Sequence, residues 1–267
     1  MDAQMVHSSF PWLVNSVTGF DTSEINPLES IPIAILTRQM RLTFEQMGFN
    51  GFLYYGVLDE MPESAQETLY QPQWKHEHRF IGTMGVNTLI QYHRETGGDR
   101  RIRERIFSAQ QLFQREPLDH RIPQQRKVQD FFTALDVHSQ LFVPVHGLTG
   151  RGWHCQFMLN SGLSDLELAS WLKDHQVSLL NACFYFHSLL MRDYSYLFNP
   201  WLINEMISDR ALDVLTLTAN GLGSKEIAGK INLSEKGVNY HLNHLRELLG
   251  AENRVHLVAV AKDMRII

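Results

Sequence analysis

The feature that most constrains the fold of this chain is an apolar pattern bracketed by Ser234 and Gly250. Its apolar positions are spaced four, three, three and one residues apart, which places them on one face of an α-helix. Serine is a favoured N-cap residue, and glycine is favoured just after a helix C-cap. We therefore expect one amphipathic helix here, whose apolar face consists of Val238, Leu242, Leu245, Leu248 and Leu249.

The opposite face of this helix carries hydrogen-bond donors and almost no carboxylate. Phosphate contacts from such side chains give a nucleic-acid complex its salt-dependent affinity, and contacts with base edges give it sequence preference. Donors of this kind also occur on helix faces that contact only water, so the pattern alone leaves both interpretations open. The side chains concerned are Lys236, Asn239, Tyr240, Asn243, His244 and Arg246.

Three further short helices surround the predicted one. We expect them over residues 211–219, over residues 225–230 with Ser224 as the N-cap, and after Asn253. Only Asn232-Leu233 links the second helix to the long third one. A tight link of this kind is typical of a helix-turn-helix, in which the longer helix reads DNA. The alternative is a four-helix packing module that never contacts DNA.

The residues from Gly223 to Leu242, continued by Arg246, Leu249-Gly250 and Asn253-Arg254, resemble the signature of the LuxR-type DNA-binding domain. The resemblance implies a homodimer that binds double-stranded DNA at an inverted repeat in a promoter. The family pattern usually has glutamate, threonine and lysine where this chain has Ala211, Gly237 and Asn239, and the missing lysine weakens the expected affinity. The residues that we expect at the DNA are Lys225, Ser234, Lys236, Asn239, Tyr240, Asn243, His244, Arg246 and Arg254.

The charge of the chain is unevenly distributed. The net charge is −5, yet residues 208–267 contain eight lysines and arginines against seven aspartates and glutamates. The C-terminal part is therefore the better partner for a polyanion. Asn199-Pro200 interrupts a helical pattern, because a residue before proline is pushed out of the α region. We expect a sensor and dimerisation domain over residues 1–190, a linker over 191–207 and the DNA-binding domain over 208–267.

The preceding two-thirds of the chain mix helical and strand patterns. A helix is expected over residues 33–47, followed by strands over 49–58, 139–147 and 153–159. Ser164-Asp-Leu-Glu167 is a capping box that opens a long helix. These elements predict an α/β (α+β) sandwich, a ligand-binding-like domain placed before an all-α helix-turn-helix domain.

This arrangement is similar to the autoinducer-binding domain that precedes the LuxR-type module in quorum-sensing regulators. Gly48-Phe49 and Val143-Pro-Val-His-Gly147 are the closest local matches. The resemblance implies that the long helix beginning near Ser164 supplies the dimer contact. An amphipathic helix is otherwise simply part of the core.

The family holds an acyl-homoserine lactone with a Trp, a Tyr four residues later and an Asp-Pro nine residues beyond. Trp74 matches the first position, whereas His78 and Asn87 occupy the other two, and Gln140 stands near a position where the family prefers glycine. A carboxylate accepting the ligand amide contributes about 1.5–3 kcal/mol, against about 1 kcal/mol for a neutral acceptor. We therefore expect a pocket formed by Trp74, His78 and Asn87 that does not bind lactones through the usual contacts.

Other functional classes lack support in the sequence. No apolar run approaches the roughly 18 residues of a membrane span, and the N-terminus lacks the features of a signal peptide. Two cysteines, Cys155 and Cys183, cannot form a disulfide framework or a four-thiolate zinc site. His76-Glu77-His78 and His154-Cys155 lack the spacing of zinc ligands. We expect a cytoplasmic protein with no membrane partner, no metal and no cofactor.

Catalytic motifs are also missing. The sequence contains no nucleophile elbow, no Walker loop and no dinucleotide fingerprint, so we expect no catalytic residues and no enzyme activity. The predicted function is that of a quorum-sensing LuxR-type transcription regulator, an orphan (solo) member of the VqsR kind. Two alternatives stay open. One is a lactone-responsive receptor with a remodelled pocket, and the other is an antagonist that forms heterodimers with another LuxR-type regulator.

Overall fold

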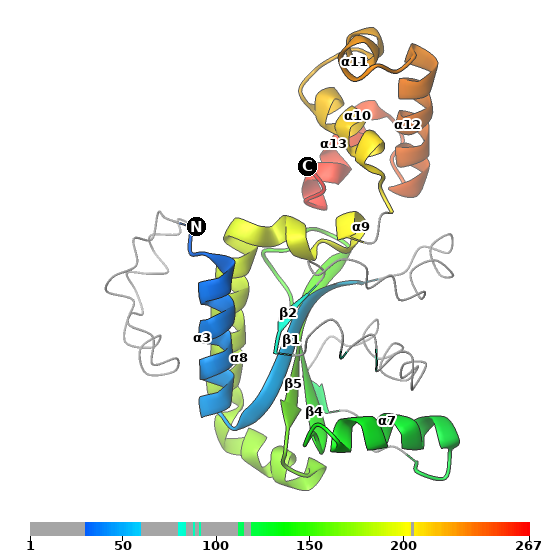
Figure 1. Cartoon of the computed structure of the whole chain (residues 1–267). Helices are drawn as coiled ribbons and strands as arrows, with labels where there is room; N and C mark the ends of the chain where they lie inside the picture. Colours follow the sequence, from blue (N-terminus) through cyan, green and yellow to red (C-terminus); the bar gives the residue numbers. More distant parts are fainter. Residues whose placement is uncertain are drawn as a thin grey trace.

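The structure is a computed structural model, and it describes residues 30–59, 80–83, 88, 91, 112–114, 119–203 and 206–267. Within these residues an α/β unit is followed by a C-terminal unit made of helices alone (Figure 1). The predicted fold class is therefore confirmed. No helix in the described ranges has both the length and the apolar composition needed to cross a membrane.

The α/β unit is built on one antiparallel sheet. In this part of the chain the strand order is β2-β1-β5-β4-β3, with β5 at the centre. β4 and β5 form a hairpin, with its loop over residues 146–152. The strands are β1 (Phe49–Leu58), β2 (Phe80–Gly82), β3 (Phe113–Gln114), β4 (Ser139–Val145) and β5 (Trp153–Ser161).

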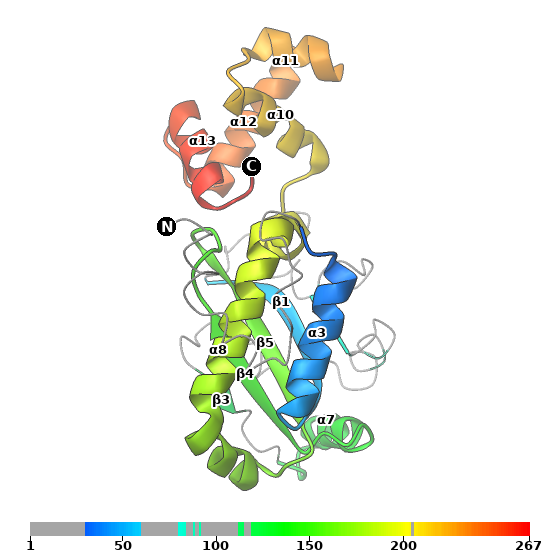
Figure 2. The same cartoon turned by 90° about the vertical axis from the view of Figure 1, so that its left-hand side faces the viewer.

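Two helices cover one face of the sheet. α3 (Ile33–Gln46) and α8 (Asp165–Phe198) run side by side across it (Figure 2). Phe44 of α3 and Phe186 of α8 have ring centroids 6.2 Å apart, and Phe44 also lies 5.6 Å from Phe157 of β5. α7 (Pro123–Thr133) packs in a smaller cluster with Val137. The predicted helices and strands of the α/β unit are thus present, with the helix layer on one side of the sheet.

The central strand β5 is buried on both of its faces. Trp153, Cys155, Phe157 and Leu159 belong to the apolar core shared with α3 and α8. Side chains alternate along a strand, so the residues between them point to the other face of the sheet. That second face is buried as well, although it carries polar groups, namely His154, Gln156 and Asn160.

His187 of α8 joins three parts of this unit. Its Nδ1 lies 2.8 Å from the hydroxyl of Tyr54, and its Nε2 lies 2.6 Å from the carbonyl oxygen of Gly147. Burial lowers the pKa of His187 to about 4, so the ring is neutral near pH 7. A neutral ring has one donor and one acceptor, so Nε2 donates to Gly147 and Nδ1 accepts from Tyr54.

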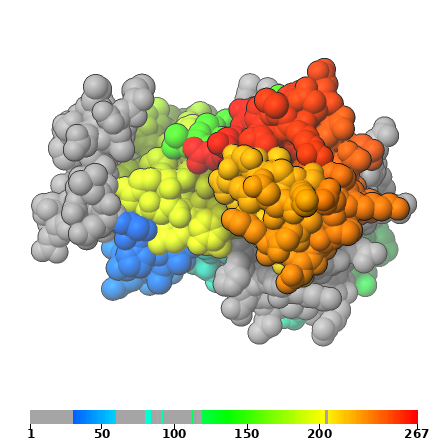
Figure 3. All heavy atoms as spheres, turned by 90° about the horizontal axis from the view of Figure 1, so that it is seen from above, coloured from blue at the N-terminus to red at the C-terminus, as the bar shows by residue number. Residues whose placement is uncertain are grey.

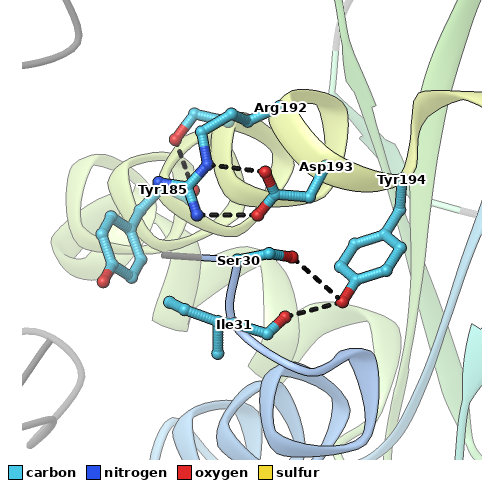
Figure 4. A network of polar contacts seen from close by, with 7 residues as sticks. Ser30, Ile31, Tyr185, Arg192, Asp193 and Tyr194 are labelled. Atoms are coloured by element: carbon cyan, nitrogen blue, oxygen red, sulfur yellow. Dashed lines mark hydrogen bonds and ion pairs between the residues drawn. The ribbon is translucent and has the colours of Figure 1, made fainter. Parts of the chain in front are cut away.

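Helix α8 begins at the predicted capping box and bends near its end. Ser164 Oγ accepts from the amide of Glu167, whose carboxylate in turn accepts from the amide of Ser164. At Tyr194 the backbone leaves the helical region (φ −132°, ψ 19°), and its hydroxyl donates to the carbonyl oxygen of Ile31 at 2.9 Å. Figure 4 shows this contact beside the ion pair of Arg192 with Asp193. The bend is thus tied to the residues that precede α3.

The segment expected as a linker is largely helical. α8 continues to Phe198, and α9 (Pro200–Ile203) follows directly after Asn199. The proline ends one helix and begins the next, as its fixed φ and missing N–H allow.

The C-terminal unit contains the four predicted helices. They are α10 (Asp209–Ala219), α11 (Ser224–Ile231), α12 (Glu235–Leu248) and α13 (Arg254–Asp263). Ser234 caps α12 as predicted, and Gly250 adopts a positive φ of 64° just after the α12 C-cap. Asn253 caps α13, the helix expected after it. The prediction of Ser224 as an N-cap is wrong. Gly223 is the N-cap of α11, because the Glu226 carboxylate accepts from the Gly223 amide at 2.8 Å and thereby closes the first turn.

The two units are joined by hydrogen bonds to the end of the chain. The indole Nε1 of Trp153 donates to the carbonyl oxygen of Met264 at 3.0 Å. The side-chain amide of Asn199 donates to the carbonyl oxygens of Met264 and Arg265, each at 3.0 Å. In Figure 3 the red C-terminal segment accordingly lies against the yellow end of α8. The helix-turn-helix unit therefore docks on the α/β unit through its last residues.

We predict that Gly56→Ala destabilises the α/β unit. A Cβ at Gly56 would lie 1.7 Å from the carbonyl oxygen of Phe198, so the end of α8 must move away from β1. Overpacking of this kind costs about 1–3 kcal/mol, and backbone contact places Gly56→Ala at the upper end. Chemical denaturation measures the free energy of unfolding.

Gly229→Ala is the matched control. Gly229 is exposed on α11, and a Cβ there meets no atom within 4 Å. Alanine in an exposed helix raises stability by about 0.5–1 kcal/mol. Equal stability of the two variants would contradict the close approach of α8 to Gly56.

Candidate nucleic-acid interface

Helix α12 has the amphipathic character that the sequence predicts. Val238, Leu242 and Leu245 are buried in the core of the C-terminal unit. The predicted donors Lys236, Tyr240, Asn243 and His244 are exposed, and Asn239 is half-buried between them. Positions three, four, seven and eight residues apart share one side of a helix, so these five residues form one surface, which we call the α12 face.

The α12 face begins at a helix N-terminus. Ser234 Oγ accepts from the amide of Gly237 at 3.0 Å, so this predicted DNA-contacting residue caps the helix. The positive end of the helix dipole and the side chain of Lys236 lie within the same first turn. Both favour an approaching phosphate group.

Asn239 connects three helices of the unit. Its Oδ1 accepts from Ser224 Oγ at 2.8 Å and from the guanidinium of Arg254 at 2.7 Å. Ser224 begins α11 and Arg254 begins α13, so the start of each helix is fixed relative to the middle of α12. The sequence predicts Asn239 and Arg254 as separate DNA contacts and does not reveal this link.

Two aromatic side chains add a flat surface to the α12 face. The rings of Tyr240 and His244 are stacked, with an interplanar angle of 8° and centroids 6.4 Å apart. Tyr240 is 68% exposed. Neighbouring positions four residues apart bring these rings together beside Asn243.

Arg246 lies apart from this surface and has a structural contact. Its guanidinium donates to the carbonyl oxygen of Glu252 at 2.6 Å, and its Nε is buried. The side chain therefore holds the turn between α12 and α13. Lys225 is exposed on α11. Contact of either residue with phosphate stays a prediction.

The predicted ligand-pocket residues Trp74, His78 and Asn87 lie outside the described residues. Gln140 is described, and it is fully buried on the sheet face opposite α3 and α8. Its Nε2 lies 2.8 Å from Oδ1 of Asn160 and 3.5 Å from the sulfur of Met158. The bulk expected at this position is thus accommodated by pairing across β4 and β5.

Tyr55 and Gln156 continue this polar row. The side-chain amide of Gln156 donates to the hydroxyl of Tyr55 at 3.2 Å. Burial raises the pKa of Tyr55 above the ordinary tyrosine value, so its hydroxyl stays protonated. Tyr55 and Gln156 therefore contribute neutral polar groups to the second sheet face.

Comparison with known proteins identifies the C-terminal unit. Residues 205–261 match the family described as bacterial regulatory proteins, luxR family. Oxygen regulatory protein NreC from Staphylococcus aureus strains JH9 and Mu3 is 36% identical over 63 residues, which are 24% of this chain. The chain spans only 29% of the length of these relatives. The predicted LuxR-type helix-turn-helix is therefore confirmed for this unit.

Solved structures with a similar arrangement include two of SdiA. SdiA in complex with octanoyl-rac-glycerol has a TM-score of 0.45 at 16% identity, over 96% of this chain and 95% of that one. A crystal structure of Escherichia coli SdiA has a TM-score of 0.39 at 14% identity, over 90% and 93% of the two chains.

We predict that Lys236→Ala weakens DNA binding and flattens its salt dependence. Each lost phosphate contact lowers the slope of log K against log salt by about 0.9 per bound subunit. Fluorescence anisotropy at several salt concentrations measures this slope. Lys173→Ala removes the same charge from the exposed surface of α8 and should leave the slope unchanged. Identical slopes for the two variants would remove Lys236 from the interface.

We predict that Arg246→Ala lowers the stability of the C-terminal unit. The change removes the hydrogen bond to the Glu252 carbonyl, and bonds from charged donors contribute about 1.5–3 kcal/mol. Because the residue is only half-buried, we expect a loss of about 1.5 kcal/mol in thermal or urea unfolding. Lys236→Ala serves as the comparison and should be neutral. An Arg246→Ala protein as stable as the parent would leave Arg246 without a structural role.

Proposed function

We propose that this protein is a transcription regulator that binds an inverted repeat in promoter DNA as a homodimer. The observation that carries the proposal is the α12 face, five polar side chains of which four are exposed, on the third helix of a domain that matches the luxR family. None of the five side chains that form this face carries a negative charge, namely those of Lys236, Asn239, Tyr240, Asn243 and His244. Such a surface suits contact with phosphate groups and base edges. Because a transcription regulator acts on DNA, we propose that the protein is cytoplasmic.

An exposed apolar stripe on α8 supports the dimer. Leu166, Val177 and Phe184 are 85%, 72% and 47% exposed. Separations of 11 and 7 residues return all three to nearly the same side of the helix. Apolar side chains aligned in this way favour contact with a second copy. Two α12 faces in one complex also supply the charge that a single unit lacks.

We further propose that the protein is an orphan regulator that does not bind acyl-homoserine lactone through the usual contacts. Asn87 replaces a carboxylate and His78 replaces a phenol in the sequence pattern. In the described part of the sheet, Gln140 already pairs with Asn160 on the face opposite the helix layer. No catalytic role is proposed for any residue.

Two alternatives make different predictions. A receptor with a remodelled pocket is stabilised by a lactone of one particular chain length. An antagonist that forms heterodimers with another LuxR-type regulator does not bind an inverted repeat on its own. Binding of the isolated protein to such a repeat, with a steep salt slope, therefore separates the proposed regulator from the antagonist.

We predict that acyl-homoserine lactones of any chain length leave the unfolding temperature unchanged in protein expressed in a lactone-free host. A ligand at 100 times its dissociation constant adds about 2.7 kcal/mol, which is a shift of several degrees for a protein of this size. Asn87→Asp combined with His78→Tyr is the matched variant, in which we expect a shift to appear. A shift in the parent protein would establish the receptor instead.

A further inference from the structure

Three side chains that bind metal ions in other proteins meet at one end of the sheet. Asp59 directly follows β1, His146 directly follows β4, and His154 is the second residue of β5. Their potential ligand atoms all lie within 4.8 Å of one another. The strand register explains the meeting, because Leu58 pairs with Trp153 and Val145 pairs with Cys155.

The geometry of the three groups is that of a compact cluster. Nδ1 of His154 lies 2.7 Å from Oδ1 of Asp59. The rings of His146 and His154 have centroids 4.6 Å apart and are tilted by 34°. Asp59 and His146 are exposed, whereas His154 is only 2% exposed, so the cluster has a buried base and an open side.

Nδ1 is the ring nitrogen of His154 that faces the other two groups, because it lies 2.7 Å from Oδ1 of Asp59. An ion bound between them takes the place of this contact. Its ligands are Nδ1 of His154, the carboxylate of Asp59 and one ring nitrogen of His146.

We propose that Asp59, His146 and His154 bind a divalent transition-metal ion such as Zn²⁺. Two imidazoles and one carboxylate are a donor set that suits Zn²⁺ and its neighbours, whereas Mg²⁺ and Ca²⁺ prefer oxygen ligands alone. The open side leaves room for water to complete the coordination.

The sequence predicts no metal site, because neither His76-Glu77-His78 nor His154-Cys155 has the spacing of zinc ligands. His154-Cys155 was the nearest pair, yet successive residues of a strand point to opposite faces. Cys155 belongs to the apolar core beneath α8, away from His154. The partners of His154 instead come from the ends of two other strands.

The proposed site borders the contact between the two units. The loop that joins His146 to His154 includes Arg151, whose amide donates to the carbonyl oxygen of Asp263 at 2.9 Å. Its guanidinium lies 3.3 Å from the Asp263 carboxylate, and the amide of Asp59 donates to the carbonyl oxygen of Gly152. An ion bound by His146 and His154 holds the two ends of this loop together. It therefore restrains Arg151, the loop residue that contacts the end of α13.

The test is metal titration of the full-length, tag-free protein after treatment with a chelator. Co²⁺ is the spectroscopic probe, and Zn²⁺ is followed by calorimetry. We expect His146→Ala to weaken binding of either ion at least tenfold. The exposed position of His146 makes this variant the one that leaves the fold intact.

His138→Ala is the control. His138 lies 3.3 Å from Asp136, an exposed pair of the same residue types that has no third potential ligand among the described residues. We expect this variant to bind both ions like the parent. Equal affinity of the parent and the His146→Ala protein, or no binding by the parent, would overturn the proposal.

Hydrogen exchange gives a second readout. Zn²⁺ should slow exchange of the Arg151 amide in the parent and in His138→Ala, but not in His146→Ala. Slower exchange in all three proteins would mean that the ion acts elsewhere, and would overturn the assignment to these three residues.

Discussion

Burial of β5 on both faces is the constraint on which the rest of the described structure depends. The strand pairs with β1 on one side and with β4 on the other, so its backbone groups are satisfied within the sheet. One of its faces packs against α3 and α8 through Phe157 and its neighbours. The other face must bury polar side chains, and it does so by pairing them with groups on adjacent strands. β5 therefore has an apolar layer on one of its faces and a polar layer on the other.

The beginning of the same strand links the sheet to the DNA-binding unit. Trp153 belongs to the apolar core and also donates to Met264, so the position of the C-terminal segment depends on the packing of that core. His154, the next residue, lies on the polar face. On one face of the strand, Trp153 packs in the apolar core and binds Met264. On the other face, the adjacent residue His154 contacts the Asp59 carboxylate.

Local features of the fold could be predicted from the sequence, and non-local ones could not. Ser234, Gly250 and Asn253 mark helix ends because capping depends on residues a few positions apart. The prediction of Ser224 as an N-cap was wrong because glycine and serine are both good N-cap residues. The hydrogen bond from the Gly223 amide to Glu226 favours Gly223. No periodicity reveals that Arg246 holds the Glu252 carbonyl, or that Asn239 joins Ser224 to Arg254. These contacts depend on how helices cross. The roles of Trp74, His78 and Asn87 rest on the sequence alone, because they lie outside the described residues.

The hydrogen bonds that hold the chain end have donors and acceptors of different kinds. The donors are the side chains of Trp153 and Asn199, whereas the acceptors are backbone carbonyl oxygens of Met264 and Arg265. A carbonyl oxygen is present whatever side chain a residue carries. Homologous sequences can therefore vary at positions 264 and 265 and keep these bonds, while variation at the two donor positions removes them. The side chains that docking requires therefore lie outside the helix-turn-helix unit, in the part of the sequence that precedes it.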